Sequence, residues 1–131
     1  MRQNSFSKVH PLLAYLLGLV VSFAITRLLL FVSPHFNLNL GSYNIHHLYL
    51  GAVLLIFIAI FQIAGVSNNY LAVIAGVSSA LILDQLVFLI ATDGGDLTYL
   101  GAVSFWGGVI STVIIAGIAI GIYFLNAKKK R

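Results

Sequence analysis

Two adjacent histidines, His46 and His47, lie in the first turn of one predicted apolar helix, and a lone aspartate, Asp84, interrupts another apolar run. Imidazole and carboxylate side chains together suit a divalent transition metal such as zinc, iron or manganese, and buried acids also line proton paths. The spacing opposes a shared metal, because neighbouring residues on a helix point about 100° apart. Metal-binding helices place their two histidines four positions apart instead.

Arg27 offers Asp84 a different partner at a similar depth. Charged side chains inside a membrane commonly pair, so an Arg27–Asp84 ion pair that fixes two helices in register is the alternative to a metal or proton site. Arg27 could also extend to the lipid headgroups. Asp93, Asp96 and His35 are further candidates to complete a site.

The composition places these residues in a membrane protein. The chain has 131 residues, of which 60% are hydrophobic and 8% charged, whereas about a quarter are charged in soluble proteins. Mean hydropathy is +1.05, and cysteine is absent, which excludes disulfides and thiolate metal sites. We expect a single integral membrane domain over residues 1–131.

Four apolar runs are long enough to cross a bilayer, which takes roughly 20 residues, so the predicted fold is an all-α bundle of four transmembrane helices. Pro11 suits the first position of a helix, and the first run exceeds the core of a cleaved signal peptide, about 7 to 15 residues. Asn44 is the expected N-cap of the second helix. The predicted spans are 11–32, 45–65, 70–91 and 99–125.

Lys8 and residues 128–131 hold five of the seven basic residues. Because cytoplasmic loops and tails carry the excess of Lys and Arg, both termini are expected in the cytoplasm of a multi-pass protein of the cell membrane. The two histidines and the acidic residues then lie in the outer half. The basic tails are interpreted as topology signals, with no nucleic-acid partner, and the tail at 128–131 could also attract anionic lipids.

Small residues allow membrane helices to approach closely. Ala80 and four glycines follow such spacings and are expected at helix contacts; these glycines are Gly51, Gly76, Gly117 and Gly121. Aromatic residues near the outer boundary are expected to form an interfacial belt, namely Tyr43, Tyr49, Tyr99 and Trp106. The segment 93–96 lacks the spacing of a calcium loop and is interpreted as a turn.

Several of these residues also resemble a group of small, functionally uncharacterised integral membrane proteins of prokaryotes. The resemblance covers roughly residues 45–110 and rests on Ile45-His46-His47 with Gly51, on Leu83-Asp84-Gln85, and on a segment that contains Asp96, Tyr99 and Ser104. Gln85 stands where the group usually has Glu, which weakens a metal site with two acids. The resemblance links His46, His47 and Asp84 as a set and implies no activity.

The leading hypothesis is a small polytopic membrane protein with an outward-facing polar site of His46, His47 and Asp84, used for binding or assembly. The expected partners are the lipid bilayer and a homo-oligomer or larger membrane complex. One alternative is a metal-dependent membrane enzyme that acts on a lipid or quinone. The other is a component of a proton or ion transporter, for which buried acids are typical.

Overall fold

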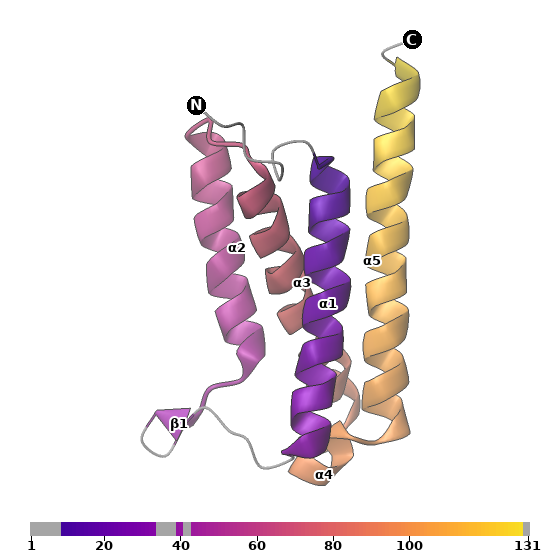
Figure 1. Cartoon of the computed structure of the whole chain (residues 1–131). Coiled ribbons are helices and arrows are strands. Elements are labelled where there is room, and N and C mark those ends of the chain that lie inside the picture. Colours follow the sequence, from indigo (N-terminus) through magenta and orange to yellow (C-terminus); the bar gives the residue numbers. More distant parts are fainter. Residues whose placement is uncertain (1–8, 34–38, 41–42, 130–131) are drawn as a thin grey trace.

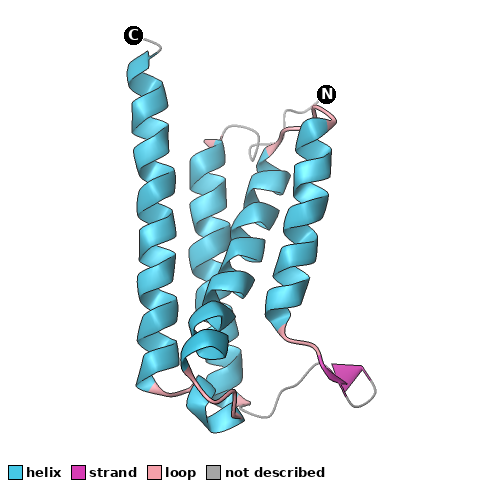
Figure 2. Ribbon diagram, turned by 180° about the vertical axis from the view of Figure 1, so that it is seen from behind, coloured by secondary structure: helices cyan, strands magenta, loops and turns pink. Residues whose placement is uncertain are grey.

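The computed structural model describes residues 9–33, 39–40 and 43–129. Four long helices run alternately up and down (Figure 1), and Figure 2 shows the same arrangement from behind. The elements are α1 (Pro11–Val32), β1 (Asn39–Leu40), β2 (Tyr43–Asn44), α2 (His47–Ile63), α3 (Asn69–Ala91), α4 (Asp96–Tyr99) and α5 (Ala102–Lys129). We call the end where α1 begins and α5 ends the terminal end, and the opposite end, which holds α4, the α4 end.

The predicted all-helical bundle is confirmed. Three of its helices, α1, α3 and α5, are long and apolar enough to cross a membrane. The remaining long helix, α2, is also apolar but has 17 residues. At about 1.5 Å per residue it is roughly 26 Å long, slightly less than the hydrocarbon core of about 30 Å.

Two helix boundaries differ from the prediction. Asn44 does not cap the second helix, because its backbone pairs with Asn39 in an antiparallel two-stranded ribbon. His46 takes the cap position in an extended conformation, and the helix begins at His47 rather than at residue 45. The predicted span 99–125 is divided, since α4 ends at Tyr99 and α5 starts at Ala102 after a turn in which Gly101 N donates to Thr98 O at 3.0 Å.

Helix α3 is the centre of the bundle. It packs against α1, α2 and α5, whereas α2 packs chiefly on α3. Near the terminal end Gly76 lies against the backbone of Tyr15 on α1, and a Cβ added there would lie 2.6 Å from the Leu19 backbone nitrogen. Leu19 and Ala80 are fully buried and form the core with Leu83. The polar part of α3 lies beyond this core, toward the α4 end.

The predicted contacts at Gly51, Gly76 and Ala80 are confirmed, since an added Cβ at Gly51 would lie 2.6 Å from the Ser78 carbonyl oxygen and Ala80 is buried. The prediction for Gly117 and Gly121 within the bundle is wrong, because a Cβ at either position would meet nothing within 4 Å. Helix α5 packs instead through buried residues four apart, Ser104, Gly108 and Thr112. Gly117 lies about 140° around the helix from that stripe.

Replacement of Gly76 by Ala should destabilise the bundle. Alanine has the higher helix propensity by about 1 kcal/mol, but its methyl group would overlap the α1 backbone, and overpacking typically costs about 1 to 3 kcal/mol. Thermal unfolding in detergent, followed by the fluorescence of Trp106, measures the change. Gly117→Ala is the matched control and should leave the midpoint unchanged or raise it. Equal destabilisation by both variants would contradict the packing described here.

Candidate functional site

The polar residues of the helices converge on Asp84 of α3, which is fully buried. One carboxylate oxygen, Oδ1, forms an ion pair with Nε of Arg27 from α1. The other, Oδ2, accepts hydrogen bonds from His47 Nε2 of α2 at 2.9 Å and from the Tyr99 hydroxyl of α4. The carboxylate is therefore compensated by side chains from three other helices, as an acid in an apolar environment requires.

Arg27 extends this network to α5. Its Nη1 donates to the Tyr99 carbonyl oxygen at 3.1 Å, and its Nη2 donates to the carbonyl oxygens of Asp84 and Ser104, both at 3.0 Å. The guanidinium also lies 4.4 Å from the centre of the Tyr99 ring, within cation–π range. Arg27 is only 8% exposed, so it is buried in the bundle and does not extend to headgroups.

His47 contributes its ring with a defined tautomer. A carboxylate only accepts hydrogen bonds, so the proton of the bond to Asp84 lies on Nε2 when the imidazole is neutral. Nδ1 then carries the lone pair. The side chain is 15% exposed, which makes His47 the most exposed residue of the network.

Gln85, the neighbour of Asp84, holds the start of α2. Its Oε1 accepts from the backbone nitrogen of Leu48 at 3.0 Å, and its Nε2 lies 3.2 Å from Nδ1 of His46. The first amides of a helix lack partners within the helix, and His46 makes no side-chain cap bond. An amide side chain from α3 thus performs the capping role predicted for Asn44, and unlike a carboxylate it can also donate to an imidazole.

The two histidines therefore face different residues, His46 facing Gln85 and His47 facing Asp84. Across residues 9–33, 39–40 and 43–129, no group of three His, Asp or Glu side chains is arranged to hold a metal ion. The predicted metal set of His46, His47 and Asp84 has no support from this geometry. His35 lies outside the described residues, as does the side chain of Asp96, whose backbone begins α4.

Asp93 belongs to a solvent-exposed turn and not to the buried network. Its Oδ1 accepts from the Thr98 hydroxyl at 2.8 Å and from the Gly95 backbone nitrogen at 3.1 Å. These two bonds, first that of Thr98, lower the pKa of the Asp93 carboxyl. The turn interpretation of residues 93–96 agrees with this geometry, in which Gly94 takes a positive φ of 77° that glycine adopts readily.

Tyr99, Ser104 and Gln85 are the network residues that reasoning from residue types did not identify. Tyr99 does not belong to the predicted interfacial aromatic belt, because it is 6% exposed and its hydroxyl donates to Asp84. The sequence signal for Tyr99 and Ser104 is a pair of hydroxyl side chains five positions apart. Both residues belong to the segment of the proposed resemblance. Tyr49 and Trp106 are exposed, as a belt requires.

We define the Asp84 cluster as Asp84, the residues that these contacts join to it, and its neighbour Gln85, which binds the start of α2. The cluster is Arg27, His47, Asp84, Gln85, Tyr99 and Ser104. Replacement of Asp84 by Asn should destabilise the protein by about 3 to 5 kcal/mol, since it leaves a buried Arg27 charge without its counter-charge. Arg27→Met should cost a similar amount. The double variant should lose clearly less than the sum of the two, because it removes both charges.

Equilibrium unfolding in a mild detergent measures these differences. Asp93→Asn is the matched control, because it makes the same chemical change at an exposed turn. Additive losses in the double variant, or an Asp84→Asn variant as stable as the control, would show that the charges of Arg27 and Asp84 are not coupled.

Comparisons with known proteins assign no family to this chain. No protein family, curated protein or solved structure matches the chain.

Proposed function

We propose that the protein is a four-span integral membrane protein whose role is binding or assembly within the membrane, with the Asp84 cluster as its internal clamp. The observation that carries the proposal is that protein side chains compensate the charge of the Asp84 carboxylate. Arg27 forms an ion pair with Oδ1, and His47 and Tyr99 donate hydrogen bonds to Oδ2. No ligand is therefore needed to compensate the charge.

The proposal counts α2 as the fourth span. A length of 17 residues is at the lower limit of the range of about 17 to 25 for membrane-spanning helices, and many of its residues are exposed and apolar, including Val53, Ile56, Phe57 and Ile60. Such a surface is unfavourable in water and suits lipid or a partner helix.

Orientation follows from charge. Lys128 and Lys129 form the last turn of α5 at the terminal end, and basic residues favour the cytoplasmic side. In this orientation the Asp84 cluster lies in the outer half of the membrane, with α4 at the outer surface.

The two alternative functions have less support. A metal-dependent enzyme acting on a lipid or quinone needs a group of metal ligands, and none is arranged in the described part of the chain. A transporter needs polar groups that continue across the membrane. Toward the terminal end, however, the core residues Leu19, Ala80 and Leu83 follow the cluster, and the Ser78 and Ser79 hydroxyls donate to carbonyls of their own helix.

The orientation is testable with a matched pair of single cysteines, since the chain has none of its own. Ser33 and Ser67 are both exposed, at the α4 end and the terminal end respectively. A membrane-impermeant maleimide should label Ser33→Cys in intact cells and Ser67→Cys only after the membrane is opened. The reverse pattern would place the cluster in the inner half and contradict the orientation.

Assembly is testable by photo-crosslinking in native membranes. Phe57 on α2 and Phe124 on α5 are exposed phenylalanines, and replacement of either by benzoyl-phenylalanine changes little but adds a reactive ketone. We expect a discrete adduct larger than the monomer from at least one position, because these faces are left uncovered by the bundle. Asp84→Asn should weaken that adduct, whereas Asp93→Asn should not. Monomer alone at both positions after irradiation would contradict an assembly role.

A further inference from the structure

The start of α2 is held to α3 by one amide side chain whose orientation is fixed. Gln85 Oε1 accepts from the Leu48 backbone nitrogen at 3.0 Å, and Gln85 Nε2 lies 3.2 Å from His46 Nδ1. A backbone N–H can only donate, so the amide oxygen faces Leu48 and the NH2 group faces His46. His46 Nδ1 therefore accepts, and the proton of the neutral ring lies on Nε2. We call these three residues the α2 latch.

Protonation of His46 is incompatible with the α2 latch. An imidazolium ion carries a hydrogen on both ring nitrogens, so Nδ1–H would face the NH2 group of Gln85. Reversal of the amide only moves the conflict, because the NH2 group would then face the Leu48 N–H. His46 is also the N-cap of α2, where the positive end of the helix dipole disfavours a cation. His47 differs, because a proton added to its Nδ1 leaves the bond from Nε2 to Asp84 in place.

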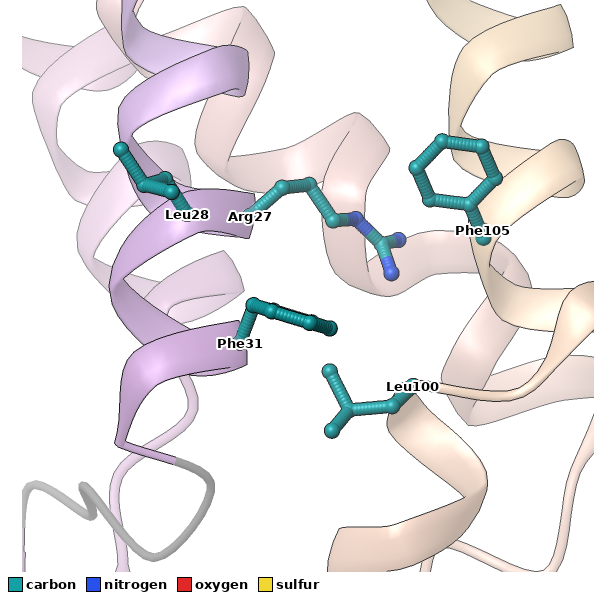
Figure 3. Close-up of a pocket in the computed structure, with 5 residues that line it drawn as sticks. All are labelled: Arg27, Leu28, Phe31, Leu100 and Phe105. Atoms are coloured by element: carbon teal, nitrogen blue, oxygen red, sulfur yellow. The ribbon is translucent and has the colours of Figure 1, made fainter.

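Within the part of the chain that the structure describes, no acidic side chain bonds to His46 and favours its protonated form. Asp84, the neighbour of Gln85, forms its ion pair with Arg27, which extends from α1 toward α5 and Phe105 (Figure 3). The first half of α5 has no titratable residue, and the side chain of Tyr43 on β2 lies outside the described residues. The other titratable or charged groups at this end are Arg27 of α1, His47 and Tyr49 of α2, Asp84 of α3 and Tyr99 of α4.

Opening of the α2 latch is confined to the first turn of α2. Gly51 lies against the backbone of Ser78, since an added Cβ would lie 2.6 Å from the Ser78 carbonyl oxygen. This contact contains no titratable group, so α2 stays packed on α3 beyond its first turn. His46 itself is partly exposed, which gives protons from the adjacent aqueous phase access to the ring.

We propose that the α2 latch is a pH-sensitive contact that opens when His46 binds a proton. Imidazole groups in general change charge between about pH 5 and 8, so the latch is closed toward the alkaline end of this range and opens toward the acidic end. The open turn binds the proton freely and the closed turn does not, so acid favours the open turn. In the orientation proposed above the latch responds to the pH on the outer side of the membrane, but its chemistry does not depend on that orientation.

Hydrogen–deuterium exchange of the Leu48 backbone amide in the full chain tests the α2 latch. The protein is kept in detergent with a chelator, so that only the proton concentration changes, and each rate is compared with the intrinsic rate at the same pH. We expect protection of the Leu48 amide to fall about tenfold between about pH 7.5 and 5.5, which is roughly the worth of one hydrogen bond. The Leu71 amide is the internal reference, because Asn68 Oδ1 holds it at 2.9 Å without a histidine. Its protection should stay constant.

His46→Asn removes the titration and keeps an acceptor, because the amide oxygen of Asn can take the place of Nδ1. Protection of the Leu48 amide should then be equal at both pH values. His10→Asn is the matched control, since His10 Nδ1 also accepts from a helix amide, that of Leu12 at 3.2 Å, but at the terminal end. This variant should retain the tenfold fall at Leu48.

Gln85→Glu is the second variant, because a carboxylate accepts from both the Leu48 amide and a protonated His46. Protection at acidic pH should then equal or exceed protection at alkaline pH. The proposal is overturned if the unmodified protein protects the Leu48 amide equally at both pH values. It is also overturned if the fall persists in a folded His46→Asn or Gln85→Glu variant, which would assign it to another group such as His47. Circular dichroism shows whether each variant is folded. Because the experiment follows one amide in detergent, its failure leaves the proposed orientation and assembly unaffected.

Discussion

Compensation of one negative charge in an apolar environment is the constraint on which this structure depends. A carboxylate within a membrane helix costs about 2.5 to 3.5 kcal/mol on insertion scales, and Asp84 is fully buried. The guanidinium of Arg27 and the protons of His47 and Tyr99 meet this cost together. Since each partner comes from a different helix, the same contacts that neutralise Asp84 also determine where α1, α2 and α4 stand around α3.

The central position of α3 explains how the packing changes along the bundle. Near the terminal end, Gly76 and Gly18 let the backbones of α1 and α3 approach closely. Near the α4 end a cation is inserted, and Gly108 of α5 makes room for it, because a Cβ there would lie 2.9 Å from Arg27 Nη2. Small residues thus join α1 and α3 near the terminal end, and a long charged side chain lies among α1, α3 and α5 near the α4 end.

Much of this arrangement could be predicted from the sequence. The lengths of the apolar runs predict the long helices. The cost of burying an acid predicts that Asp84 faces inward, with Arg27 or a histidine nearby. Residues placed by tertiary contacts were not predictable in the same way. Asn44 has the right type for a cap, but strand pairing with Asn39 uses its backbone. Glycines four apart, such as Gly117 and Gly121, indicate that close approach is allowed, and they do not specify which face of the helix meets a neighbour.

We infer that the Asp84 cluster contributes more to the specificity of helix packing than to stability. A buried ion pair often stabilises a protein no more than apolar side chains of the same volume, so Met and Leu at positions 27 and 84 could give a bundle that is equally stable. Apolar contacts, however, allow a helix to slide or rotate at little cost. The carboxylate accepts hydrogen bonds from His47 and Tyr99 and forms an ion pair with Arg27. At the adjacent residue, Gln85 accepts from the start of α2. A displaced helix would leave a buried charge or amide without its partner, which selects one arrangement of the four helices.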